Sequence, residues 1–247
     1  MTSEPCLFLQ WDTDFFGFRI ARAVVPALDN RIVEAIGDWC KRQRIECLYF
    51  VARTDDRQTI RQAERNGFRL VEIRLNMERS LRNWNPDTRP RAAEGISIRC
   101  ARPEDVPICQ DIARTSYVDS RYYFDEHFLE EKCRAYYAVW IKKSLEGGAE
   151  LALVAQKGND VVGYITGVLD KSKLEAQYEL TGVRAAERKA GVGQELFRAG
   201  LDWYVRRNVE CVWLATQGRN VPAQRMAQRN GFITRSCQLY YHKWFTA

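Results

Sequence analysis

The sequence predicts an α/β protein with a mixed sheet, and three observations lead to this fold class. Its 247 residues, 46% of them hydrophobic, exceed what one compact domain needs and are enough for two. Apolar runs of strand length alternate with amphipathic segments of helix length. One segment of the first half also recurs, without a gap, in the second half. Because strands and helices alternate around an expected hairpin, the sheet should contain both parallel and antiparallel pairs.

The two copies of the repeat are Ile45–Phe68 and Val209–Phe232. Each copy reads as a buried strand, a polar turn and an amphipathic helix that closes on Asn-Gly-Phe, where glycine is typical of a left-handed residue after a helix. A chance likeness is the alternative. We expect two related domains, residues 1–80 and 96–247, joined by a linker at 81–95 that contains two prolines and little apolar periodicity.

The elements follow from the periodicity of the apolar residues. In the first half, the runs 45–51 and 68–75 predict strands. In the second half, the turn at 157–160 predicts a hairpin between the first two of three strands. The elements expected there are, in order, a strand at 96–100, helices near 104–115 and 124–145, strands at 151–156, 161–169 and 174–183, a helix at about 191–206, a strand at 211–216, a helix at 221–229 and a strand at 233–244.

Composition excludes several classes of protein. The net charge of +6 is spread along the chain without a block of like charges, so no nucleic-acid partner is expected. No apolar stretch approaches about 18 residues, so no membrane span is expected. The N-terminus lacks the pattern of a secretory signal, and the eight cysteines form no CxxC pair. We therefore predict a cytoplasmic protein with free thiols and, with only two histidines, no metal site.

The stretch most informative about function is residues 178–196, which read YELTGVRAAERKAGVGQEL. A strand ends at Val183, a basic turn follows, and Gly191 and Gly193 open a helix. Glycines let the backbone approach an anion, and the first N–H groups of a helix are unsatisfied. Flanking basic side chains, Arg184, Arg188 and Lys189, add positive charge. The stretch predicts a site for a pyrophosphate-bearing ligand, with close packing of the helix start as the alternative.

The pattern R-x-x-G-x-G from Arg188 to Gly193, after a strand and before a helix, resembles the coenzyme A-binding motif of the GCN5-related N-acetyltransferase (GNAT) superfamily. The order of the elements is similar too. The resemblance implies a mixed sheet of the GNAT type and acetyl-CoA as co-substrate. It also implies these coenzyme-binding residues: Leu180, Thr181, Val183, Arg188, Lys189, Ala190, Gly191, Val192, Gly193 and Asn220. Asn220 is equally well explained as the N-cap of the helix at 221–229.

Three further motifs, Trp11–Phe18, Asp119–Tyr123 and Ala215–Gln217, resemble the dTDP-fucosamine acetyltransferase type of that superfamily. This resemblance implies a reduced GNAT-like N-terminal domain. It also implies an acceptor amine on a nucleotide-linked 4-amino-4,6-dideoxy sugar. Candidate acceptor-binding residues are Ser120, Arg121 and Tyr123, with Arg121 suited to a phosphate and an ordinary surface loop as the alternative.

The resemblance also implies that the strand at 211–216 diverges from the end of the strand at 174–183. Glu179 is the candidate base, because it lies on that strand near the point of divergence. A solvent-facing charge is the alternative. The superfamily often protonates the leaving thiolate from a tyrosine that here is replaced by Ala227. Tyr240 and Tyr241 are the candidate substitutes. They adjoin on a strand, so only one of them can face the site. Tyr117 or water would be the other source of the proton.

These observations predict an N-acyltransferase that works by direct transfer in a ternary complex of acetyl-CoA and a small amine acceptor. No cysteine lies in the coenzyme motif, so no acyl-enzyme is expected. Two alternatives stay open: a GNAT enzyme for another amine, such as a protein lysine or a small metabolite, and an acyl-CoA-binding module without turnover. The sequence does not fix the oligomeric state and is compatible with a homodimer.

Overall fold

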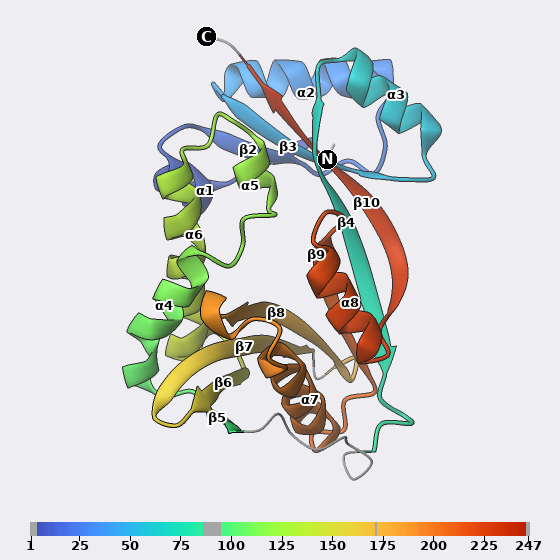
Figure 1. Cartoon of the computed structure of the whole chain (residues 1–247). Coiled ribbons are helices and arrows are strands. Elements are labelled where there is room, and N and C mark those ends of the chain that lie inside the picture. Colours follow the sequence, from blue (N-terminus) through green and yellow to red (C-terminus); the bar gives the residue numbers. More distant parts are fainter. Residues whose placement is uncertain (1–3, 86–94, 171, 246–247) are drawn as a thin grey trace.

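A computed structural model describes residues 4–85, 95–170 and 172–245 (Figure 1). The strands are β1 (Cys6–Phe8), β2 (Ile20–Ala23), β3 (Cys47–Arg53), β4 (Arg69–Ser80), β5 (Ile96–Cys100), β6 (Leu151–Lys157), β7 (Asp160–Asp170), β8 (Glu175–Val183), β9 (Cys211–Gln217) and β10 (Ile233–Trp244). The helices are α1 (Gln10–Phe16), α2 (Asn30–Arg42), α3 (Arg57–Arg65), α4 (Val106–Arg114), α5 (Arg121–Phe124), α6 (Glu130–Lys143), α7 (Val192–Val205) and α8 (Val221–Arg229).

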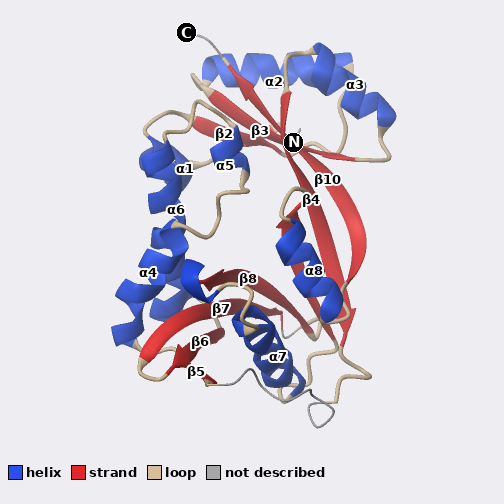
Figure 2. Ribbon diagram, viewed as in Figure 1, coloured by secondary structure: helices blue, strands red, loops and turns tan. Residues whose placement is uncertain are grey.

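One sheet of ten strands runs through the described part of the chain, in the order β1-β2-β3-β10-β4-β9-β8-β7-β6-β5. The pairs β2–β3 and β8–β9 are parallel and the others are antiparallel, so the sheet is mixed, as predicted. The units β3-α3-β4 and β9-α8-β10 exchange their last strands. Strand β10 lies between β3 and β4, and β4 lies between β9 and β10. Figure 2 shows β4 and β10 running side by side through the centre of the molecule.

The two copies of the repeat have the same local geometry. Gly67 and Gly231, just after α3 and α8, both have a φ of 76°. The asparagine before each glycine donates from its side chain to a carbonyl of the helix, and the buried phenylalanine after it donates its N–H to an alanine carbonyl. These alanines are Ala63 and Ala227, and both are fully buried. The likeness read from the sequence is therefore a likeness of structure.

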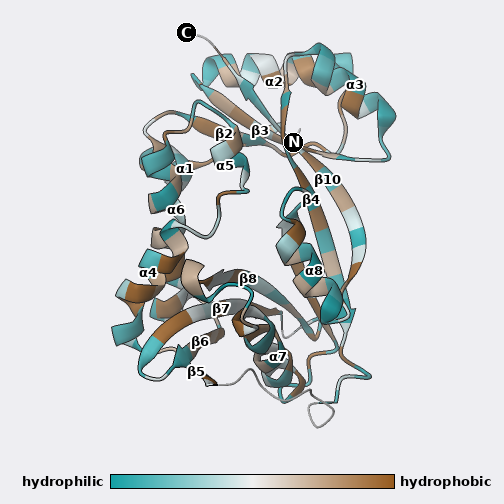
Figure 3. Cartoon of the chain, in the orientation of Figure 1, coloured by the Kyte–Doolittle hydropathy of each residue, from teal (hydrophilic) through white to brown (hydrophobic). Residues whose placement is uncertain are grey.

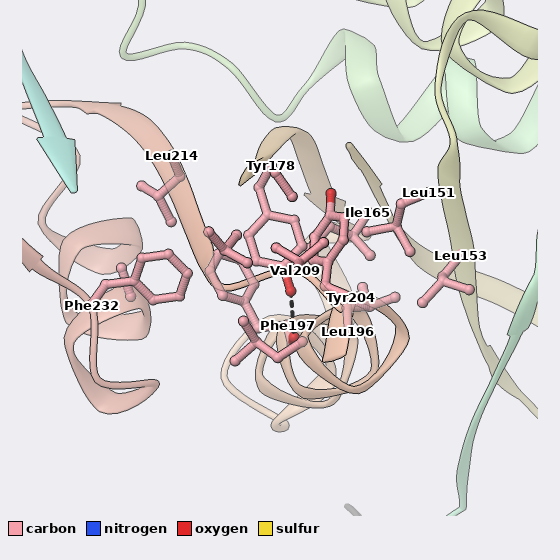
Figure 4. Close-up of a cluster of buried hydrophobic side chains, with 14 of the residues drawn as sticks. Leu151, Leu153, Ile165, Tyr178, Leu196, Phe197, Tyr204, Val209, Leu214 and Phe232 are labelled. Atoms are coloured by element: carbon pink, nitrogen blue, oxygen red, sulfur yellow. Dashed lines mark hydrogen bonds between the residues drawn. The ribbon is translucent and has the colours of Figure 1, made fainter. Parts of the chain in front are cut away.

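Three hydrophobic clusters hold helices against the sheet. Helices α2 and α3 pack on the first strands through a cluster that includes Phe50 and Tyr241. Helices α7 and α8 pack on the last strands around Tyr178 and Phe197, as Figure 4 shows. The third cluster lies beneath α1, α4, α5 and α6 and joins the two halves of the chain, since Tyr49 of β3 belongs to it. In Figure 3 the helices carry both hydrophilic and hydrophobic residues, as expected of helices with one face on a sheet.

The structure corrects one predicted helix. The helix expected over 124–145 begins only at Glu130, as α6, whereas Phe124 ends α5 and Asp125 between the two helices is extended. The Asp125 carboxylate contacts His242 Nδ1 at 2.6 Å and His127 Nδ1 at 2.8 Å, and accepts a hydrogen bond from Trp244 Nε1. These long-range bonds outweigh the local helical pattern. The expected linker is described only at 81–85 and 95, and the rest of it lies outside the described residues.

Candidate active site

The site begins where two parallel strands separate. Strands β8 and β9 pair from Glu175 and Cys211 to Tyr178 and Leu214, and no further. Beyond that point β8 continues to Val183 and β9 to Gln217 without pairing to each other. Figure 1 shows the two strands diverging. The gap exposes one edge of the last residues of β8, as the sequence predicted.

A β-bulge in β8 directs the candidate base toward this gap. Gly167 pairs with Tyr178 and Ile165 pairs with Thr181, so three steps along β8 oppose two along β7. The extra residue lies at Glu179–Leu180. A bulge re-aims side chains. Tyr178 packs against α7, whereas the next buried residue, Leu180, packs on the opposite face with α4 and α6. Glu179 lines a pocket on that same face.

The pocket has a volume of about 270 Å³ and lies between α1, α6 and β8. Burial raises the pKa of Glu179, Glu150 raises it further, and Lys143 opposes the shift. A carboxylate with a raised pKa is a better proton acceptor near neutral pH than an exposed one. Glu179 therefore lies in a pocket with a raised pKa, and its role as a general base stays a prediction. The residues that line the pocket are Trp11, Tyr136, Val139, Trp140, Lys143, Ser144, Gly148 and Glu179.

The Gly-rich loop presents its backbone at the start of α7. Lys189 and Gly191 have left-handed conformations, with φ of 68° and 86°. Within the described residues, none of the backbone N–H groups from Lys189 to Gln194 donates to a backbone carbonyl, whereas Glu195 N–H bonds to Gly191. This run includes Ala190, Val192 and Gly193. Unsatisfied N–H groups at a helix start are suited to binding an anion. The loop therefore fits the pyrophosphate of coenzyme A.

Two of the basic side chains expected around that anion have other partners. Arg184 Nη2 donates to the Val161 carbonyl at 2.8 Å. Arg188 donates to the carbonyls of Val183 and Thr115, so it fastens the loop to β8 and to the end of α4. Arg188 and Lys189 are both exposed. Asn220 Oδ1 accepts from Ala223 N–H at 3.1 Å, so it caps α8, and a contact of Asn220 with the coenzyme stays a prediction.

The two adjacent tyrosines of β10 lie on opposite faces of the sheet. Tyr241 is buried against Phe50, in the cluster beneath α2 and α3, far from the pocket. Tyr240 lies on the face that carries α5, where its hydroxyl accepts from Arg74 Nη1 at 2.9 Å. Of the two candidates for protonating the thiolate, the structure therefore retains Tyr240. Tyr117 bonds instead to Tyr164, with 3.0 Å between their hydroxyl oxygens.

Ala227 leaves no space for the tyrosine that the superfamily often has on this helix. Its side chain is fully buried in the cluster beneath α7 and α8. A tyrosine ring at this position would overlap the surrounding core, so Ala227→Tyr is not expected to bring a hydroxyl to the thioester.

The acceptor candidates on α5 are less accessible than expected. Ser120 is buried, and Tyr123 is half-buried. Arg121 points inward: its Nη2 donates to Tyr122 Oη at 2.7 Å, and its guanidinium lies over the rings of Tyr122 and Tyr49. Tyr122 Oη is 3.4 Å from Tyr136 Oη, at the wall of the pocket. Arg121 therefore reaches the pocket only through Tyr122 and Tyr136. Its contact with an acceptor phosphate stays a prediction.

Of the eight residues that line the pocket, sequence reasoning named only Glu179 as a site residue; Trp11, Tyr136 and Lys143 are among those it missed. Phe128 and Tyr137 of the same aromatic-rich segment are buried in the core, whereas Trp140 lines the pocket. Helical spacing alone does not separate these two roles. Across the described ranges, no three His, Cys, Asp or Glu side chains gather in a way that could hold a metal ion.

Comparisons with known proteins agree with this geometry. Residues 111–232 match the acetyltransferase (GNAT) family. The chain is 27% identical, over 142 residues, to the spore coat polysaccharide biosynthesis protein SpsD of Bacillus subtilis; the match covers 58% of this chain and 48% of that protein, so the chain spans about half of its length.

Two solved structures share the fold over both halves of the chain. A GCN5-related N-acetyltransferase from Sphaerobacter thermophilus has a TM-score of 0.71 at 18% identity, covering 97% of this chain and 76% of its own. A tandem GNAT protein from the clavulanic acid biosynthesis pathway has a TM-score of 0.64 at 16% identity, covering 91% of this chain and 75% of its own. None of the helices in the described residues is long and apolar enough to cross a bilayer. Residues 111–232 therefore carry an acetyltransferase (GNAT) domain, and this domain and the fold are consistent with an acyltransferase that uses acetyl-CoA.

Proposed function

We propose that the protein transfers the acetyl group of acetyl-CoA to the amine of a nucleotide-linked amino-dideoxy sugar, directly within a ternary complex. The observation that carries this proposal is the position of Glu179. It lies at the bulge where β8 and β9 begin to separate and faces a pocket with aromatic walls. The similarity to a polysaccharide biosynthesis protein supports a sugar acceptor.

The residues support the following course of reaction. The N–H groups of Lys189 to Gly193 bind the pyrophosphate of the coenzyme. The unpaired edge of β8 from Leu180 to Val183, Thr181 included, bonds to the pantetheine arm, which brings the thioester to Glu179. The acceptor nitrogen attacks the thioester carbonyl and forms the C–N bond. Glu179 takes the proton that this nitrogen loses.

Collapse of the tetrahedral intermediate breaks the C–S bond and releases the coenzyme as a thiolate. Ordinary thiols have a pKa of about 8.5, so a weak proton donor is enough. Water or Tyr240 supplies this proton, because Ala227 carries no donor. Product is the N-acetylated sugar nucleotide, and no covalent acyl-enzyme is formed.

We also propose that residues 1–80 form a reduced GNAT-like domain and residues 96–247 the catalytic domain. The matching ends of α3 and α8 support this division, and so does the likeness to a tandem GNAT protein. We also propose a cytoplasmic location, because all eight cysteines are free thiols, as is usual in a reducing compartment.

The test is release of coenzyme A thiol by the purified protein with acetyl-CoA and a panel of amines. The panel contains a dTDP-linked 4-amino-4,6-dideoxyhexose, a lysine peptide and spermidine, and mass spectrometry identifies each product. We expect turnover with the amino sugar alone. Turnover restricted to the peptide or the polyamine would replace the proposed acceptor. Binding of acetyl-CoA without turnover of any amine would make the protein a binding module.

A further inference from the structure

We infer that the first half of the chain selects the acceptor: Trp11 of α1, with Tyr136 and Trp140 of α6, forms an aromatic subsite for the pyranose ring of the amino sugar. The inference rests on the proposed function. It adds a ligand-binding role for a residue far in sequence from the acetyltransferase match at 111–232. It also assigns a function to the Trp11–Phe18 motif, none of whose residues belongs to the proposed coenzyme site.

Helix α1 is fixed to α6 so that Trp11 closes one side of the pocket. The ring of Trp11 stacks on Phe15 at 5.2 Å and meets Tyr136 edge-on at the same distance. Phe15 also meets Tyr136 edge-on, and Lys132 Nζ donates to the Phe15 carbonyl at 2.9 Å. Despite these contacts Trp11 is 46% exposed. A large aromatic side chain held in place with a free surface at a pocket is a typical binding feature.

The shape of the pocket favours a non-planar ligand. Trp11 and Tyr136 are inclined at 71°, and Tyr136 and Trp140 at 85°, so the rings form corners and not a parallel slot for a flat heterocycle. The volume of about 270 Å³ is near the lower limit of about 300 Å³ for pockets that bind drug-sized molecules. One sugar ring is of suitable size, and the nucleotide then lies outside the pocket.

The lining of the pocket combines the three rings with three polar side chains, Glu179, Lys143 and Ser144. A 6-deoxy amino sugar has the same mixed character, because it carries C–H groups and a methyl as well as hydroxyl and amine groups.

The experiment compares Trp11→Ala and Trp11→Phe with the natural protein, using the dTDP-linked 4-amino-4,6-dideoxyhexose and acetyl-CoA. We expect Trp11→Ala to raise the KM of the sugar about tenfold, the range of an aromatic contact, with the KM of acetyl-CoA unchanged. Trp11→Phe should keep most of the affinity. Trp203→Ala is the matched control, because Trp203 is a half-buried tryptophan near the far end of α7.

A second measurement follows intrinsic fluorescence during titration with the same sugar. The natural protein should show a larger change than Trp11→Phe, which still binds and keeps Trp140 in the subsite. An unchanged sugar KM in Trp11→Ala, or equal rises for sugar and acetyl-CoA, would overturn the subsite while leaving the proposed function standing. If the natural protein does not acetylate the sugar, the proposed function fails first, and the panel of amines reports that failure independently of Trp11.

Discussion

Replacing Gly191 by glutamate should abolish acetyl-CoA binding and leave the protein folded. Gly191 is the N-cap of α7 and has a φ of 86°, and the N–H groups around it have no backbone partner in the described residues. The substitution adds a side chain and a negative charge at the point where the pyrophosphate must approach. The two consequences, for stability and for binding, have different magnitudes.

The effect on stability should be small. A residue with a Cβ in the left-handed region costs about 1–2 kcal/mol. A carboxylate at a helix N-terminus stabilises the folded state by about 0.3–1 kcal/mol through the helix dipole. The net loss is about 1 kcal/mol, which for a chain of this size lowers Tm by about 2–4 °C.

The effect on binding should be large. Each hydrogen bond from an N–H group to a charged phosphate contributes about 1.5–3 kcal/mol. Loss of two such bonds weakens binding by at least about 3 kcal/mol, which is more than 100-fold. Repulsion between the new carboxylate and the pyrophosphate acts in the same direction.

The assay is titration calorimetry with acetyl-CoA, together with thermal unfolding. Gly158→Glu is the matched control, because Gly158 is an exposed glycine with a φ of 58° in the β6–β7 turn. It should lose similar stability and bind acetyl-CoA normally. Unchanged affinity in a folded Gly191→Glu variant would refute the assignment of the coenzyme site.

Three other predictions follow. Glu179→Gln should lower kcat about 10²–10⁴-fold and remove the acidic limb of the pH–rate profile, which the raised pKa of Glu179 should set; a retained limb would argue against it as the base. Tyr240→Phe should slow turnover and Tyr241→Phe should not, because only Tyr240 faces the α5 side; equal rates in kinetic assays would exclude both as donors. Burial acts to raise the pKa of Asp125, but hydrogen bonds from His242 and its neighbours hold that pKa below the usual range. The Asp125 carboxylate therefore stabilises the fold above the unfolded pKa of about 3.9, and this stabilisation is lost as pH falls. Asp125→Asn should therefore cost about 1.5–3 kcal/mol in urea unfolding at pH 7 and less at about pH 3, and a difference independent of pH would contradict this.

The parts of the site that local sequence determines were predicted well. Strand, turn and helix around Gly191 depend on neighbouring residues, and so does the Asn-Gly-Phe end of both repeat helices. Glu179 lines the pocket, but its role as the base stays a prediction, and the cause of its orientation was not visible in the sequence. The bulge arises from the pairing of β8 with β7, and an alternating pattern on one strand does not record it.

The remaining errors have one physical source, which is contact between distant segments. Asp125 leaves the helical pattern because side chains of β10, more than a hundred positions later, bond to it. The sequence left open which of Tyr240 and Tyr241 faces the site, because that depends on which strands flank β10. Arg121 was predicted to contact a phosphate of the acceptor, and its position over the rings of Tyr49 and Tyr122 was not foreseen. No periodicity within these segments carries that information.

The exchange of strands makes the two halves of the chain one catalytic unit. Strand β4 of the first half pairs with β9 up to Gln217, at the end of the gap that should admit the thioester. Strand β10 of the second half, with Tyr240, is held between β3 and β4. Removing the first half would leave β9 and β10 with unpaired edges, which favour aggregation, and would take away Trp11. The acetyltransferase match at 111–232 therefore marks the segment that carries the coenzyme motif, whereas the acceptor pocket and the sheet that supports it require residues from both halves.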